Sequence, residues 1–182
     1  MADAPDSPSS WRTIAAVVLV AGGLLLGGTV LLRTLHPANG ASAGTDVRSV
    51  AFVDAQGQRH TLAEFQGKVV LVDVWATWCP PCRKSLPEVA QLQHAEDGTY
   101  VVVPISVDNG GWDDVKPFLA KHPELGLTAF VPEGPKALDA FGPITGIPTS
   151  IVVDRQGRLI QRWSGYGEGM AKRALDEALK AR

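Results

Sequence analysis

Residues 70–89 read VLVDVWATWCPPCRKSLPEV, and this stretch decides the fold. The apolar run over 68–76 predicts a β-strand that is buried on both faces. A helical stretch is expected to follow over about 80–95, and it opens with Cys79 and Cys82. The segment therefore predicts a buried strand that leads directly into a helix, with both cysteines at the N-terminus of that helix. The positions of this helix expected to be buried are Leu86, Val89, Ala90 and Leu92.

The position of the cysteines favours redox chemistry. A helix N-terminus carries about half a positive charge and free N–H groups, so it stabilises a thiolate. Cys79 comes first and is expected to be the more exposed, which makes it the attacking nucleophile. Cys82, one turn inward, would resolve the mixed disulfide. Because Pro81 has no N–H to offer the Cys79 sulfur, the motif argues against a very strong oxidant.

The cysteine pair has two other interpretations. A structural zinc site would need further ligands, but the chain has only two cysteines, and its four histidines are scattered. An inert structural disulfide is compatible with the spacing alone. The strand-to-helix setting favours a redox motif over both, and the sequence predicts no metal and no cofactor. The histidines are His36, His60, His94 and His122.

The rest of the C-terminal part alternates strands and helices. This pattern predicts an α/β layer fold with a mixed central sheet. The expected elements are an N-terminal β-hairpin made of VRSVAFVD and QRHTLAEF, strands over 99–108, 127–131, 149–154 and 157–165, helices over 113–122 and 135–141, and a terminal helix from Glu168.

The N-terminal part has a different composition. Residues 13–32 contain no charge, and twenty helical residues span a hydrocarbon core of about 30 Å, which predicts a transmembrane anchor. A cleaved signal peptide ending near Ala43 is the alternative, although signal peptides have shorter apolar regions. Residues 1–12 would be a short flank, 33–47 a flexible linker and 48–182 one domain.

Composition excludes two classes of protein. The chain has 17 basic and 19 acidic side chains and a net charge of −2, so it lacks the basic surplus of a nucleic-acid binder. It is 45% hydrophobic and has five tryptophans, which excludes a disordered chain.

Two motifs resemble those of a known family. WATWCPPC is followed some 65 residues later by GIPTSIVVDRQG, and FVDAQGQRHTLAEFQGK precedes both. Over residues 46–182 the chain resembles the membrane-anchored, thioredoxin-fold thiol–disulfide reductases of the TlpA/ResA/CcmG (DsbE-like) type. The hairpin segment is typical of that branch rather than of plain thioredoxin. The resemblance implies a three-layer thioredoxin-like fold with an N-terminal hairpin extension.

The resemblance also implies roles for individual residues. Pro148 would be cis and would face the cysteines, leaving the Ile147 backbone free to pair with an extended client segment. Trp78 would shield one side of the active site. Asp73 occupies the position of the buried acid of thioredoxins, where many relatives have Asn. Burial would raise its pKa and suit it to take a proton from Cys82.

One position departs from the family pattern. Relatives commonly carry Glu three residues after the second cysteine, where this chain has Ser85. Asp73 is therefore expected to act alone, or with a weaker hydrogen bond from Ser85. This departure leaves the fine tuning of the redox potential and the client preference open.

The resemblance implies a protein-disulfide reductase in the periplasm, attached to the inner membrane. Its implied client is apocytochrome c, and its implied electron donor is a membrane thiol transporter, because the periplasm supplies no reductant. Reduction of copper-site cysteines in oxidase assembly is a second implied role. A dithiol oxidase and a non-catalytic binding module with the same groove remain alternatives.

Overall fold

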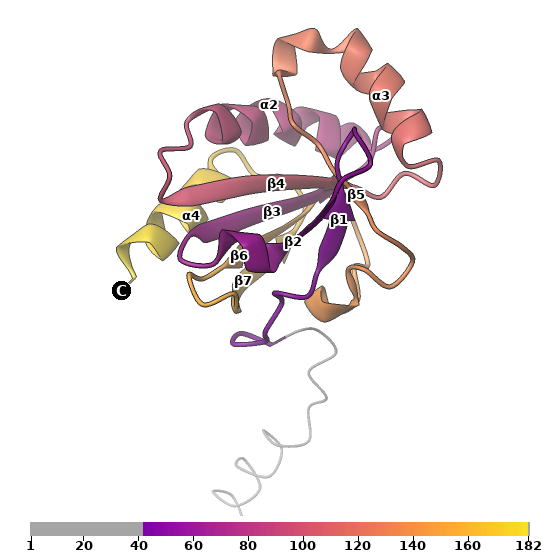
Figure 1. Cartoon of the computed structure of the whole chain (residues 1–182). Helices are drawn as coiled ribbons and strands as arrows, with labels where there is room; N and C mark the ends of the chain where they lie inside the picture. The colour runs from indigo at the N-terminus through magenta and orange to yellow at the C-terminus, as the bar shows by residue number, and fades with distance from the viewer. Residues whose placement is uncertain (1–41, 182) are drawn as a thin grey trace, which may run out of the picture. The chain divides into compact units, whose positions relative to one another are not determined.

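The apolar run ahead of the cysteines forms strand β3 (Val69–Trp75), and every residue of this strand is buried. β3 lies inside a four-stranded sheet of order β4-β3-β6-β7 (Figure 1). It is parallel to β4 (Tyr100–Ser106) and antiparallel to β6 (Thr149–Val153), and β7 (Leu159–Ser164) pairs antiparallel with β6. The mixed central sheet predicted from the sequence is confirmed. The computed structural model describes residues 42–181.

Alternate residues of β3 belong to two different apolar clusters, one on each face of the sheet. Leu71 and Trp75 belong to the cluster beneath the helices, whereas Val72 and Val74 belong to the cluster on the opposite face. Asp73 shares the parity of Leu71 and Trp75. The period of the strand therefore places this acid on the helix-covered face.

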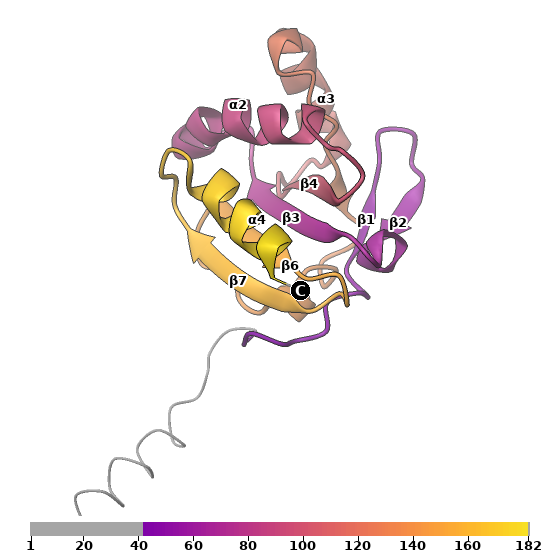
Figure 2. The same cartoon turned by 90° about the vertical axis from the view of Figure 1, so that its left-hand side faces the viewer.

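Helices α2 (Pro80–His94) and α4 (Met170–Lys180) cover one face of the central sheet (Figure 2). Helix α3 (Trp112–Lys121) contributes Val115 to the same apolar cluster. The four positions of α2 predicted to be buried are indeed buried. The N-terminal turn of α2 is thus fixed at the end of β3 by the packing of its own apolar face.

The opposite face is covered by a smaller sheet of order β2-β1-β5 and by short 3-10 helices. The predicted N-terminal hairpin is present and pairs antiparallel. Phe52 and Phe141 are fully buried on this face. The elements of this layer are β1 (Ala51–Val53), β2 (Arg59–Thr61), β5 (Val131–Pro132), η1 (Leu62–Phe65) and η3 (Asp139–Phe141). The third 3-10 helix, η2 (Pro123–Leu125), lies on the helix-covered face, where Leu125 joins the other apolar cluster.

Several predicted elements are shorter than the sequence suggested, and the first hairpin strand, expected over 47–54, spans only Ala51–Val53. The second hairpin strand ends at Thr61, because the Glu64 carboxylate accepts a hydrogen bond from the Thr61 N–H at 2.8 Å and starts a 3-10 turn. The strand expected over 127–131 is reduced to Val131–Pro132, where proline removes a ladder donor. The helix expected over 135–141 is a turn followed by η3.

The linker assignment needs a change at its end. Gly44 N–H donates to Leu159 O at 2.7 Å, and Val47 N–H donates to Gly157 O at 2.9 Å, so these residues pair with the domain. The predicted flank 1–12, the anchor 13–32 and the linker up to residue 41 lie outside the described residues. Within residues 42–181, no helix is both long and apolar enough to span a bilayer.

Candidate active site

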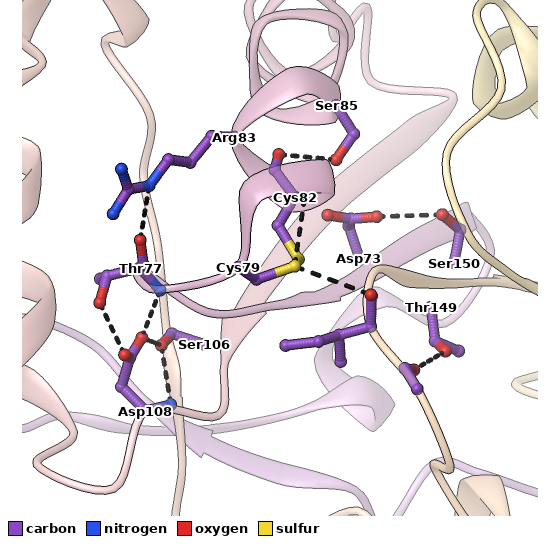
Figure 3. Close-up of a disulfide and its surroundings, with 12 residues drawn as sticks. Asp73, Thr77, Cys79, Cys82, Arg83, Ser85, Ser106, Asp108, Thr149 and Ser150 are labelled. Atoms are coloured by element: carbon purple, nitrogen blue, oxygen red, sulfur yellow. Dashed lines mark hydrogen bonds between the residues drawn. A yellow bond between two sulfur atoms is a disulfide. The ribbon is translucent and has the colours of Figure 1, made fainter.

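Cys79 and Cys82 form a disulfide at the junction of β3 and α2 (Figure 3). Cys79 is the N-cap residue of α2, and its sulfur accepts a hydrogen bond from the Cys82 N–H at 3.2 Å. The first two helical residues are Pro80 and Pro81, so the amide of Cys82 is the first that the helix offers. The absence of an N–H donor at Pro81 was predicted. The hydrogen bond from the Cys82 N–H to the Cys79 sulfur was not predicted, although the three-residue spacing of the two cysteines places this amide at the N-terminus of the helix.

The two sulfur-bearing residues differ little in exposure in this oxidised state. Cys79 is 3% exposed and Cys82 is 0% exposed. Their order agrees with the prediction, but Cys79 is far less accessible than a surface nucleophile.

The loop before β6 approaches the disulfide from the other side. The Ile147–Pro148 peptide bond is cis, as the resemblance implied, and Pro148 is buried. The Ile147 carbonyl oxygen lies 3.7 Å from the Cys79 sulfur. The hydroxyl of Thr149 donates to the Gly146 carbonyl at 2.6 Å and fixes the start of the loop. The loop thus places the Ile147 carbonyl oxygen, a backbone acceptor, next to the Cys79 sulfur.

Trp78 lies immediately before the nucleophile and is 62% exposed. Its side chain lines an open apolar groove of about 720 Å³ together with Ile147 and Ile144. Val107 and residues 138, 139, 142, 143, 145 and 146 complete the lining of this groove. An open apolar groove beside the cysteine pair can accommodate an extended polypeptide segment.

Asp73 is buried, as predicted, and lies on the helix-covered face of the sheet. The hydroxyl of Ser150, its cross-strand partner, donates to Asp73 Oδ1 at 3.0 Å. Among the described residues, Asp73 Oδ2 has no hydrogen-bond partner. Burial raises the pKa of Asp73 to about 7, and the nearby negative charge of Glu88 adds to this rise. Asp73 is thus a carboxyl group that exchanges its proton near neutral pH.

Ser85 does not take the place of the missing glutamate. Its hydroxyl donates to the Cys82 carbonyl at 2.9 Å, which is a contact within α2. Glu88, one turn further along the helix, lines the same small cavity as Asp73, with a volume of about 10 Å³. The Glu88 carboxylate also accepts the Gly169 N–H at 3.0 Å, next to the start of α4. Glu88 was not predicted as a site residue, although its spacing of three from Ser85 places the two side chains on the same helix face.

The geometry can support thiol–disulfide exchange. A sulfur at a helix N-terminus, a second cysteine one turn inward, a backbone acceptor beside the first sulfur and a buried acid of raised pKa are the groups such exchange needs. The N–H donor stabilises the thiolate that leaves or attacks.

Comparisons with known proteins agree with this chemistry. Residues 42–179 match the Redoxin family. The thiol-disulfide oxidoreductase ResA of Bacillus thuringiensis subsp. konkukian is 29% identical over 139 residues, which cover 75% of this chain and 76% of the relative. ResA of Halalkalibacterium halodurans is 26% identical over 170 residues, which cover 92% of this chain and 90% of the relative.

Solved structures give the same result. A DsbE-type thiol:disulfide interchange protein from Chlorobium tepidum superposes with a TM-score of 0.65 and 28% identity, covering 77% of this chain and 96% of that structure. A thioredoxin family protein described as a thiol:disulfide interchange protein, from Chlorobium tepidum TLS, is 31% identical with a TM-score of 0.62. That match covers 76% of this chain and 98% of the solved structure.

Proposed function

The chain belongs to the redoxin family and is a thiol–disulfide oxidoreductase of the thioredoxin-fold TlpA/ResA/CcmG type; from this premise we propose that it reduces disulfides of client proteins outside the cytoplasm. The observation that carries the proposal is the contact of the Cys79 sulfur with the Cys82 N–H at 3.2 Å. This contact supports Cys79 as the sulfur that is stabilised as a thiolate and Cys82 as the cysteine that acts second.

The direction of electron flow is supported by the small number of donors at the Cys79 sulfur. Pro80 and Pro81 occupy the first two helical positions and have no N–H. Strong oxidants stabilise their reduced form through a well-stabilised thiolate. A single amide donor stabilises the thiolate less, so the pair is better suited to give electrons than to accept them.

The reaction takes place in two exchange steps. The Cys79 thiolate attacks one sulfur of a client disulfide, a mixed disulfide forms, and the first client thiolate leaves. Cys82 then gives its proton to Asp73 and attacks the Cys79 sulfur, and the second client thiolate leaves. The client disulfide gains two electrons, and Cys79 and Cys82 are left as a disulfide.

Asp73 suits the second step because of its environment. Its pKa of about 7 allows it to accept a proton near neutral pH and to lose it again. The cavity beside it, about 10 Å³ in volume, has room for roughly one water molecule. Such a water would connect Asp73 Oδ2 with Glu88, which lines the same cavity. The proton that Asp73 takes from Cys82 would pass along this connection to solvent.

The cellular setting is proposed from the sequence. Residues 13–32 would hold the domain at the outer side of the inner membrane, with a cleaved signal as the alternative. A membrane thiol-transfer protein would reduce the Cys79–Cys82 disulfide again. The proposed client is apocytochrome c, whose two haem-binding cysteines must be reduced before the haem is attached. Cysteines of a copper site are the second proposed client.

Trapping tests this proposal. Cys82→Ser should leave the client attached to Cys79 as a mixed disulfide, because the second step is blocked. Cys79→Ser is the matched control and should trap nothing. Mass spectrometry of the trapped species identifies the client cysteines, and a CxxCH peptide would support the cytochrome role. If Cys82→Ser traps no protein, or if the double serine variant still complements a deletion strain, the chain acts as a binding module and the proposal is wrong.

A further inference from the structure

Thr77 lies two residues before the nucleophile, and each of its polar groups is hydrogen-bonded (Figure 3). Its N–H donates to Asp108 Oδ2 at 2.8 Å, and its hydroxyl donates to Asp108 Oδ1 at 2.7 Å. Its carbonyl oxygen accepts the Arg83 Nε–H at 2.7 Å. The loop between β3 and α2 is therefore held from two sides at this residue.

Asp108 is itself fixed at the end of β4. It is 7% exposed, and the hydroxyl of Ser106, which is fully buried, donates to Asp108 Oδ2 at 2.6 Å. Between them, the Val107 N–H donates to the Trp75 carbonyl at 2.8 Å and extends the pairing of β4 with β3. The Asp108 carboxylate thus connects the end of β4 to the loop between β3 and α2.

We infer that Asp108 is a positioning residue for Cys79: through Thr77 it keeps the nucleophile on the Cys82 amide when the disulfide opens. Breaking the disulfide removes the covalent constraint on the loop, and the hydrogen-bond partners of the Asp108 carboxylate are Thr77 and Ser106 rather than either sulfur. The polar contacts of Thr77 do not involve the sulfurs, so opening the disulfide does not itself break them. This inference rests on the oxidoreductase chemistry alone and holds for either direction of electron flow.

The side-chain chemistry separates hydrogen bonding from charge. In Asp108→Asn the amide oxygen can accept from the Thr77 N–H and from Ser106, while the amide NH₂ donates to the Thr77 hydroxyl, which rotates to accept it. Asp108→Ala removes all of these contacts. Thr77→Val keeps the shape and the backbone N–H but removes the hydroxyl.

The chain offers a matched control at the other end of the sheet. Thr99 donates both its N–H and its hydroxyl to Asp97 Oδ1, at 2.9 and 2.6 Å. Thr99→Val therefore removes the same kind of threonine–aspartate hydrogen bond far along β4 from the disulfide. A loss of general stability would affect both valine variants, whereas a loss of positioning would affect Thr77→Val alone.

The experiment measures the rate at which iodoacetamide alkylates Cys79 in the reduced full-length protein, in detergent, as a function of pH. Asp108→Ala should lower the rate at pH 7 about fivefold, and Thr77→Val about two- to threefold, with the Cys79 pKa raised in both. Asp108→Asn should stay within about twofold of the parent protein, and Thr99→Val should not change the profile.

Two results would overturn the inference. The first is an unchanged pH profile for both Asp108→Ala and Thr77→Val. The second is an equal change for Thr77→Val and Thr99→Val. If Asp108→Ala does not fold, the comparison of the two valine variants decides the question, since each removes only one exposed or half-buried hydroxyl.

Discussion

Asp73→Asn removes a buried titratable group and keeps its shape, so it tests how the protein tolerates an acid beneath the active-site helix. The pKa of Asp73 is about 7 when folded and 3.8 as the unperturbed reference. Between these values the folded protein binds one more proton than the unfolded chain does. Its free energy of unfolding must therefore fall as the pH rises through this window, and level off above pH 7.

The magnitude follows from the shift. Each pKa unit corresponds to about 1.4 kcal/mol, so ionised Asp73 lowers the free energy of unfolding by about 4 kcal/mol above pH 7. Asp73→Asn lacks this effect. We expect the variant to be more stable than the parent protein by up to about 4 kcal/mol at pH 8 and by much less at pH 4.5.

The assay is urea unfolding of the oxidised protein at several pH values from 4 to 8, followed by the fluorescence of its five tryptophans. Asp97→Asn is the control, because Asp97 is exposed and its hydrogen bonds with Thr99 lower its pKa. Its removal should not change the pH dependence above pH 5. A stability difference between Asp73→Asn and the parent that is the same at pH 4.5 and pH 8 would refute the reasoning.

Three further predictions concern the groove, the cavity and the core. Trp78→Ala should lower kcat/KM for a client disulfide about tenfold while changing stability by less than about 0.5 kcal/mol, because the side chain is exposed; an unchanged kcat/KM would remove Trp78 from the client site. Glu88→Gln should lower the Asp73 pKa, measured from the NMR shift of its carboxyl carbon, whereas Glu168→Gln should leave it unchanged. Phe141→Ala should cost about 3–5 kcal/mol in urea unfolding, since Phe141 is fully buried; a loss below about 1 kcal/mol would contradict its place in the core.

The strand-to-helix core of the site was predictable because its signals are local. The apolar run before the cysteines predicted β3, and the spacing of the apolar residues after them predicted the buried face of α2. The alternation of β3 residues also fixes the side on which Asp73 lies. The cis bond at Pro148 followed from the family resemblance rather than from its local residues.

Other features depend on contacts between distant parts of the chain. Asp108 is 31 residues from Thr77, and nothing in either segment alone shows that they meet. Glu88 reaches the cavity of Asp73 only through the packing of α2 on the sheet. The predictions of a strand over 127–131 and of a helix over 135–141 were wrong in length, because prolines and glycines shorten both elements. Tertiary packing decides where these elements end.

The midpoint potential of the Cys79–Cys82 pair tests the central claim most directly. Equilibration of the full-length protein with dithiol buffers, with the thiols counted by alkylation and mass spectrometry, gives this value. A reductant with one amide donor at its thiolate should lie at or below about −200 mV. A value near about −120 mV, typical of a strong oxidant, would contradict the proposed direction of electron transfer.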